Sequence, residues 1–188
     1  MTTRRRIPWK TLSTKTVYKN PWFHVTESKV IRPDGKPGTY NVVHTRGGSA
    51  SAYVIAIDAR GRFLIHLEYR FPTKVWSWGL PGGGVEQGEP PLTSAKRELL
   101  EEADLRARRW SKLGELQAMT GIVSEWMHIF LAKELVRATS TIHPGDEQIS
   151  DKKWVSFDQA LRMIKRGELH DSQSIAAIIL AGAHLKKI

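Results

Sequence analysis

Apolar residues recur along this chain with two periods, one typical of strands and the other of helices. Runs rich in β-branched and aromatic residues predict strands, and the clearest are 51–58 (SAYVIAID) and 62–69 (RFLIHLEY). Three residues separate these two runs, a spacing that predicts a hairpin. Other strands are expected at 22–31, 39–46, 74–80, 110–118, 126–133 and 152–155. No strand is predicted before residue 22, and the chain up to Pro8 is expected to be a loose tail.

Helical spacing of apolar residues predicts helices at 91–103, 157–166 and 171–185. Pro90 and Pro91 suit the start of the first helix, because its first turn leaves backbone N–H groups unused. The glycines before that helix, from Gly82 to Gly84, predict a loop. This order of elements predicts a mixed α/β fold, in which an N-terminal tail and hairpin (1–47) precede a main domain (48–188).

Composition narrows the possible chemistry. The 188 residues are 40% hydrophobic, enough to bury the core of one domain, and they include no cysteine. Disulfides, thiolate metal sites and cysteine nucleophiles are therefore excluded. No apolar run approaches the roughly 20 residues that cross a bilayer, and the first ten residues lack the apolar stretch of a signal peptide. We expect a cytoplasmic protein with no membrane partner.

Charge is unevenly distributed. The net charge is +10, but residues 1–48 hold ten Lys and Arg against two acids, so this part alone carries +8. Such an excess is compatible with a polyanionic partner such as nucleic acid, although a basic tail explains it equally well. The segment from Glu86 to Asp104 is the opposite, with six acids against two bases. A basic chain therefore contains a concentrated acidic segment.

Three carboxylates of that segment fall on one helix face. Glu98, Glu101 and Glu102 are three and four residues apart, and like charges at this spacing repel. Oxygen ligands in this number suit Mg²⁺ or Mn²⁺, which favour carboxylates, water and phosphate. A solvated acidic helix face remains the alternative interpretation of the helix taken by itself.

The residues around these carboxylates follow a fixed pattern of spacing. Gly83, Glu89, Arg97-Glu98-Leu99, Glu101-Glu102 and Leu105 follow G-x₅-E-x₇-R-E-U-x-E-E-x-G-U, where U is a bulky apolar residue. This pattern resembles the Nudix box, here 83–105. Asp104 replaces the glycine that ends the helix in the family. Asp tolerates the left-handed conformation better than most residues, so we expect the helix to end there with the metal site little affected.

Within the Nudix superfamily the chain is most similar to the ADP-ribose and ADP-sugar pyrophosphatases. The supporting matches are Asn20-Pro21-Trp22, Pro33-Asp34-Gly35, Glu68-Tyr69-Arg70, Phe130-Leu131-Ala132, Gly145 to Ile149 and Gly167 to Ser172. One position departs, because the group usually has Glu where this chain has Gly79. The resemblance implies an α/β/α sandwich with a mixed sheet, an N-terminal antiparallel β region, and a homodimer formed through the N-terminal strands.

The resemblance also implies a reaction. It is the Mg²⁺-dependent hydrolysis, with Mn²⁺ as a possible substitute, of the pyrophosphate bond in a nucleoside diphosphate linked to another group. ADP-ribose or an ADP-sugar would give AMP and a sugar phosphate. The implied metal ligands are Glu98, Glu102, Glu101 and the backbone carbonyl of Gly82, which the glycine run would bring close through unusual backbone angles. Arg97 would orient a carboxylate.

Other roles are assigned less directly. Glu147 is the first candidate for the general base, and Asp146 and Glu125 are the next candidates. Arg70 is expected to bind the phosphate or the terminal sugar, and Trp22 and Trp78 are the rings expected to stack on a base, although core packing explains them too.

Two alternatives to this reaction stay open. One is a Nudix-fold module that binds a nucleotide or binds RNA through the basic N-terminal part. The other is hydrolysis of RNA caps or 5′ ends by the same chemistry. Nucleic acid is not the favoured partner, since the box carboxylates are intact.

Overall fold

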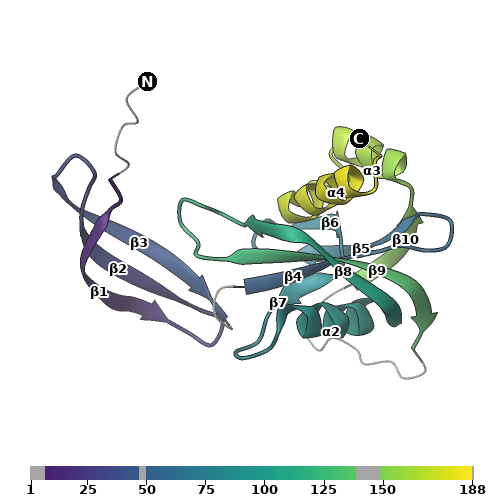
Figure 1. Ribbon diagram of the computed structural model, residues 1–188, viewed down its shortest axis with the longest axis horizontal. Helices are drawn as coiled ribbons and strands as arrows, with labels where there is room; N and C mark the ends of the chain where they lie inside the picture. Colours follow the sequence, from purple (N-terminus) through teal and green to yellow (C-terminus); the bar gives the residue numbers. More distant parts are fainter. Residues whose placement is uncertain (1–6, 47–49, 139–148, 188) are drawn as a thin grey trace.

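The computed structural model describes residues 7–46, 50–138 and 149–187, and Figure 1 shows their arrangement. The strands are β1 (Lys10–Lys19), β2 (Phe23–Ile31), β3 (Pro37–Thr45), β4 (Ala50–Ala56), β5 (Phe63–Arg70), β6 (Val75–Gly79), β7 (Gly82–Gly84), β8 (Leu105–Gln117), β9 (Trp126–Arg137) and β10 (Ile149–Val155). The helices are α2 (Pro91–Ala103), α3 (Phe157–Lys165) and α4 (Ser172–His184). No described helix has the length and apolar character needed to cross a bilayer.

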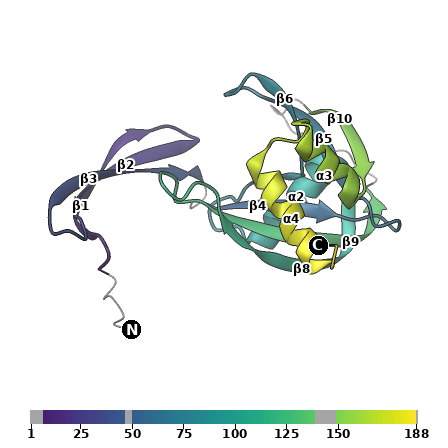
Figure 2. The same cartoon turned by 90° about the horizontal axis from the view of Figure 1, so that it is seen from above.

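The N-terminal strands form a separate antiparallel sheet in the order β1-β2-β3, which lies to one side of the main domain (Figures 1 and 2). The antiparallel N-terminal region is thus confirmed. Strand β1 was not predicted, because all ten of its residues are exposed and its sequence, KTLSTKTVYK, has no buried face to leave a hydrophobic pattern. The predicted boundary between the N-terminal part (1–47) and the main domain (48–188) lies outside the described residues.

The main domain holds two sheets. One is mixed, in the order β7-β4-β9-β8, because β4 and β9 are parallel while the outer pairs are antiparallel. The other is antiparallel, in the order β10-β5-β6. The predicted hairpin between 51–58 and 62–69 is therefore wrong: both runs are strands, but they belong to different sheets and share the single bridge Ile57–Phe63. Strand β4 is buried on both faces, and its neighbours in the sheet, β7 and β9, come from distant parts of the chain.

Helices cover both sides of these sheets, α2 on one side and α3 with α4 on the other (Figure 1). Side chains alternate along the strands, so β4 sends Ile55 toward the cluster that contains Ile178 of α4, and Val54 toward the cluster that contains Leu99 of α2. The side chains of β5 alternate in the same way, with Ile65 in the first cluster and Leu64 in the second. The predicted α/β/α sandwich is confirmed.

Helix α2 ends as expected. Asp104 takes the left-handed conformation with φ of 54°, and its N–H donates to the carbonyl of Leu100. Its carboxylate pairs with the ammonium group of Lys152 at 3.2 Å. The helix therefore stops at the same point that a glycine would impose.

Strand β3 connects the N-terminal sheet to the segment between β8 and β9. The N–H of Val43 donates to the carbonyl of Ile122 at 2.8 Å, the N–H of Ser124 donates to the carbonyl of Val43, and the hydroxyl of Tyr40 donates to the carbonyl of Gly121. These bonds fix the segment that carries Glu125 against β3.

Candidate active site

Two carboxylates of α2, those of Glu98 and Glu102, are buried. Glu98 is 5% exposed and Glu102 is 2% exposed, whereas Glu101 is only partly buried. The helical period explains this, because Glu98 and Glu102 flank Leu99, which is fully buried in the core under α2. A carboxylate buried to this degree requires hydrogen bonds or a cation. The acidic face of α2 is therefore not simply a solvated surface.

The glycine run lies directly against these carboxylates. The N–H of Gly82 donates to Oε2 of Glu102 at 2.7 Å. A Cβ at Gly83 would lie 2.5 Å from Oε1 of Glu98, and a Cβ at Gly82 would lie 2.5 Å from the carbonyl oxygen of Ala52. Only glycine fits this approach.

The run is not the loop that was expected. Gly82–Gly84 forms the short strand β7, which pairs with Ser51, Ala52 and Tyr53 of β4. None of its three glycines has a positive φ, so the expectation of unusual backbone angles is wrong. The glycines are needed for close approach to the carboxylates and to β4.

Arg97 lies among the acidic side chains of the box. Its Nη1 is 2.7 Å from Oε1 of Glu98 and 3.0 Å from Oε2 of Glu101, and its Nη2 donates to the carbonyl of Gly84 and approaches Glu89. Partial burial acts to lower the pKa of Arg97, but the neighbouring carboxylates, Glu98 first, outweigh it and raise that pKa further above its ordinary value. Arg97 is a permanent cation that holds two box carboxylates in place.

A cavity of about 590 Å³ is lined by residues outside the box, and Tyr53 has electrostatic neighbours both in that lining, such as Asp171 and Arg70, and in the box, at Glu102. The polar lining of the cavity comes from the ends of several elements and includes Thr45, Arg70, Ser77, Glu125, Asp171 and Gln173. The hydroxyl of Tyr53 donates to the side-chain oxygen of Gln173. Burial raises the pKa of Tyr53 well above its ordinary value and Asp171 raises it further, so the hydroxyl stays neutral. This volume is typical of small-molecule sites.

The structure brings together some of the predicted residues and separates others. Arg70 and Glu125 line the cavity, while the box residues lie on α2 and β7. Trp22 is 63% exposed in the turn before β2, with the guanidinium carbon of Arg46 5.9 Å from its ring centre. Trp78 packs against the core under α4, and Nζ of Lys153 lies 3.7 Å above its ring. Glu147 and Asp146 lie outside the described residues.

Sequence reasoning assigned no role to several residues near Arg70 and the box. Glu68 is buried and accepts a hydrogen bond from Nη1 of Arg70 at 2.8 Å, and His66 is almost completely buried on the same strand. A signal was available, because polar residues at alternate positions of an otherwise apolar strand share one face. Tyr53 and Gln173 left no such signal, since 120 residues separate them in sequence.

The donor set suits a hard divalent cation. Within the described ranges no three His, Asp or Glu side chains gather closely enough to hold a metal ion by themselves. Glu98 and Glu102, both buried and both against the backbone of β7, supply only oxygen ligands. Mg²⁺ uses one or two protein carboxylates and keeps several waters, so these residues fit it better than a metal that needs a complete protein cage.

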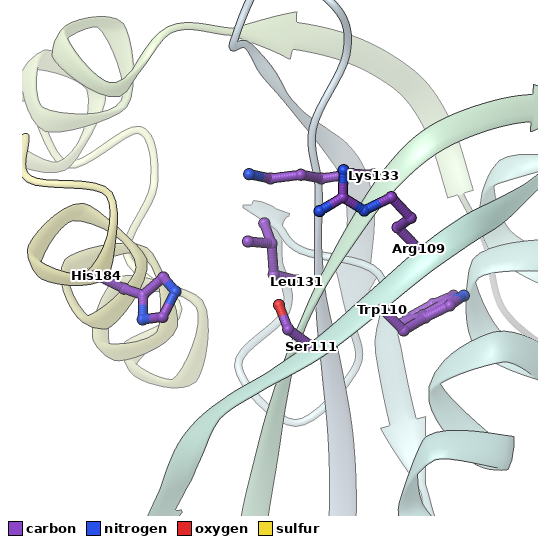
Figure 3. Close-up of a pocket in the computed structure, with 6 residues that line it drawn as sticks. All are labelled: Arg109, Trp110, Ser111, Leu131, Lys133 and His184. Atoms are coloured by element: carbon purple, nitrogen blue, oxygen red, sulfur yellow. The ribbon is translucent and has the colours of Figure 1, made fainter.

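A second cavity, of about 230 Å³, lies between the C-terminal end of α4 and strands β8 and β9 (Figure 3). Arg109, Lys133 and His184 point toward this space, together with the hydroxyl of Ser111. Its described lining holds no carboxylate, whereas the cavity of about 590 Å³ is lined by Glu125 and Asp171. The acidic site and the cavity that holds these two carboxylates are therefore the candidate active site.

Comparison with known proteins identifies the family. A family model described as NUDIX domain matches residues 49–178, and one described as nucleoside diphosphate sugar hydrolase N-terminal domain matches residues 9–43. The chain is 30% identical over 176 residues to the ADP-ribose pyrophosphatase of Mycobacterium tuberculosis, covering 93% of this chain and 84% of that protein.

A second relative and a solved structure extend the comparison. The chain is 29% identical over 181 residues to the CMP-5'-(N-acetyl-N-hydroxy-3-aminopropyl)phosphonate hydrolase of Streptomyces rubellomurinus, again covering 93% and 84% of the two chains. A crystal structure of an ADP compounds hydrolase superposes with a TM-score of 0.84 over 98% of each chain, at 19% identity. This last similarity establishes the fold.

Proposed function

Because the chain belongs to the NUDIX family and is a pyrophosphohydrolase, we propose that it hydrolyses the pyrophosphate bond of a nucleoside diphosphate sugar. ADP-ribose is our first choice, with AMP and ribose 5-phosphate as products. The observation that carries this proposal is the pair of buried carboxylates, Glu98 and Glu102, in a domain whose cavity of about 590 Å³ is lined by Arg70, among other polar residues. The family match of residues 9–43 and the name of the mycobacterial relative support the sugar nucleotide.

The box residues would hold the metal. Glu98 and Glu102 would be the main ligands of Mg²⁺ or Mn²⁺, with Glu101 sharing and the carbonyl of Gly82 adding a ligand. When bound, the metal supplies charge neutralisation for the diphosphate and a lower pKa for an attacking water. Arg97 keeps Glu98 and Glu101 oriented through its two short contacts.

The cavity would hold the substrate. Arg70 would bind the phosphate or the terminal sugar, and the carboxylate and amide groups of Glu125 and Gln173 suit sugar hydroxyls. Of the two tryptophans, Trp22 is the better stacking residue because its ring is largely exposed, whereas Lys153 lies over the ring of Trp78.

Assaying the protein against a panel of diphosphates tests the proposal. We expect release of AMP from ADP-ribose with Mg²⁺, and complete loss of release with EDTA. ADP-glucose, GDP-mannose and a capped RNA oligonucleotide belong in the same panel, because relatives with similar identity carry names with different nucleosides. Hydrolysis of none of these compounds would overturn the proposal, and preference for the cap would favour the RNA alternative.

The general base gives a further prediction. If Glu147 removes the proton from water, Glu147→Gln should lower kcat by on the order of 10²- to 10⁴-fold with little change in KM. Glu125→Gln should instead raise KM several-fold, because Glu125 lines the cavity. Steady-state kinetics with ADP-ribose separates the two, and the opposite pattern would assign the base to Glu125.

We also infer that two copies pair through the N-terminal sheet. Strand β1 lies at a sheet edge with every residue exposed, and unpaired edges of this length favour pairing with another chain. Leu12, Val17 and Tyr18 expose about half of their surface on it, and Trp9 lies just before it. These apolar side chains are the surface that a partner copy would cover.

Size-exclusion chromatography with light scattering tests this pairing. The unmodified chain is expected to be a dimer at micromolar concentration, and Leu12→Lys with Val17→Lys is expected to be a monomer. Ile179→Lys is the matched control, because Ile179 is an exposed apolar residue on α4 rather than on β1. A monomeric unmodified chain would contradict the proposal.

A further inference from the structure

Strand β5 presents a row of polar side chains toward the active site. Since side chains alternate along a strand, His66, Glu68 and Arg70 share the face of Leu64, which packs into the core under α2. The row runs from that core to Arg70 at the cavity. On the neighbouring strand β6, Gly79 stands opposite His66.

His66 is held at the centre of this row. Its side chain is only 1% exposed, and a Cβ at Gly79 would lie 4.0 Å from its Nε2, so the imidazole sits beside a position that has no side chain of its own. Within the described residues neither ring nitrogen has a hydrogen-bond partner, although both are fully buried. A buried polar group without a hydrogen-bond partner destabilises the folded protein until a partner approaches.

Two carboxylates stand at the right positions to become those partners. Nδ1 of His66 is 4.0 Å from Oε2 of Glu102, and Nε2 is 3.7 Å from Oε2 of Glu68. Both distances exceed hydrogen-bond length by about 1 Å or less. Each carboxylate also has a second contact, Glu102 with the N–H of Gly82 and Glu68 with Arg70.

We propose that His66 is a positioning residue that couples the metal-binding carboxylate Glu102 to the Glu68–Arg70 pair at the cavity, by closing both ring nitrogens onto the two carboxylates when the site is filled. In this arrangement His66 carries a proton on each ring nitrogen: Nδ1–H donates to Glu102 and fixes its orientation, and Nε2–H donates to Glu68 and through it fixes Arg70. Mutation of a residue that hydrogen-bonds to a metal ligand commonly lowers metal affinity by about 10- to 100-fold. Both the substrate and the role of Glu102 as a metal ligand rest on the proposed function, but metal binding can be measured without any substrate.

Three substitutions at His66 separate its two nitrogens. The amide of His66→Asn can replace Nδ1 and reach toward Glu102, the longer amide of His66→Gln can replace Nε2 and reach toward Glu68, and His66→Leu fills similar volume with no polar atom. Mn²⁺ affinity is measured without substrate from the free-ion electron paramagnetic resonance signal, and KM is measured with ADP-ribose.

Each variant has a distinct expected result. His66→Asn should keep Mn²⁺ affinity within about threefold while KM rises about tenfold, and His66→Gln should keep KM while Mn²⁺ binds about tenfold more weakly. His66→Leu should show both losses. Ile65→Val is the control, because Ile65 faces the opposite core, so its loss of stability should leave both quantities unchanged.

Other results would overturn the proposal. If His66→Leu keeps the original Mn²⁺ affinity and KM, the imidazole only fills space, and if His66→Asn and His66→Gln lose both quantities equally, the two-sided arrangement is wrong. Because Mn²⁺ binding needs no turnover, a protein that fails to hydrolyse ADP-ribose still reports whether His66 supports Glu102. Failure of the substrate assignment is thereby distinguished from failure of the coupling.

Discussion

Replacing Glu102 with Gln is expected to lower the rate of ADP-ribose hydrolysis by on the order of 10³-fold in Mg²⁺. The amide has nearly the same shape as the carboxylate and can still accept the hydrogen bond from the N–H of Gly82. It removes the negative charge from a side chain that is 2% exposed, where that charge is best placed to hold a divalent cation. The loss should therefore fall on chemistry rather than on folding.

Two measurements keep this prediction specific. The melting temperature without metal should not fall appreciably, because neutralising one of several neighbouring buried carboxylates removes a desolvation cost. Glu101→Gln is the matched comparison: Glu101 is only partly buried and pairs with Arg97, so its loss should be smaller, about tenfold. Unchanged turnover in Glu102→Gln would place the metal site elsewhere.

The box could be predicted from sequence because its geometry is local. The helical period alone puts Glu98 and Glu102 beside Leu99, and the left-handed end of α2 follows from one residue, Asp104. Pairing between strands is not local in this way. The short turn after Asp58 indicated a hairpin, but β4 pairs with β7 and β9, which are distant in sequence, and β5 pairs with β6 and β10.

Strand β1 and the cavity could not be predicted from the sequence. An entirely exposed strand carries no hydrophobic alternation, so Lys10–Lys19 could not be distinguished from a tail. The cavity depends on residues that only the fold brings together, such as Tyr53 on β4 and Gln173 at the start of α4. His66 shows a pattern in sequence, but its place between Glu68 and Glu102 requires the packing of α2 against β5.

The strand β7 supplies the second large effect, because its three glycines face different surroundings. A Cβ at Gly83 would meet Oε1 of Glu98 at 2.5 Å, so Gly83→Ala should push this carboxylate away while the strand stays in place. We expect turnover to fall by on the order of 10²-fold with the melting temperature little changed, since the displaced atom ends a side chain that can rotate. Activity and thermal unfolding, measured on the same preparation, test the expected loss of turnover and the expected retention of stability.

The neighbouring glycines are matched controls with opposite expectations. A Cβ at Gly82 would lie 2.5 Å from the backbone oxygen of Ala52 in β4, which cannot rotate away, so Gly82→Ala should lower stability by about 1–3 kcal/mol. A Cβ at Gly84 would meet nothing within 4 Å, so Gly84→Ala should retain both activity and stability. If Gly83→Ala is as active as the unmodified chain, contact between β7 and Glu98 does not position the metal ligands. If all three substitutions lower stability equally, the strand tolerates no side chain and the loss of turnover reflects folding.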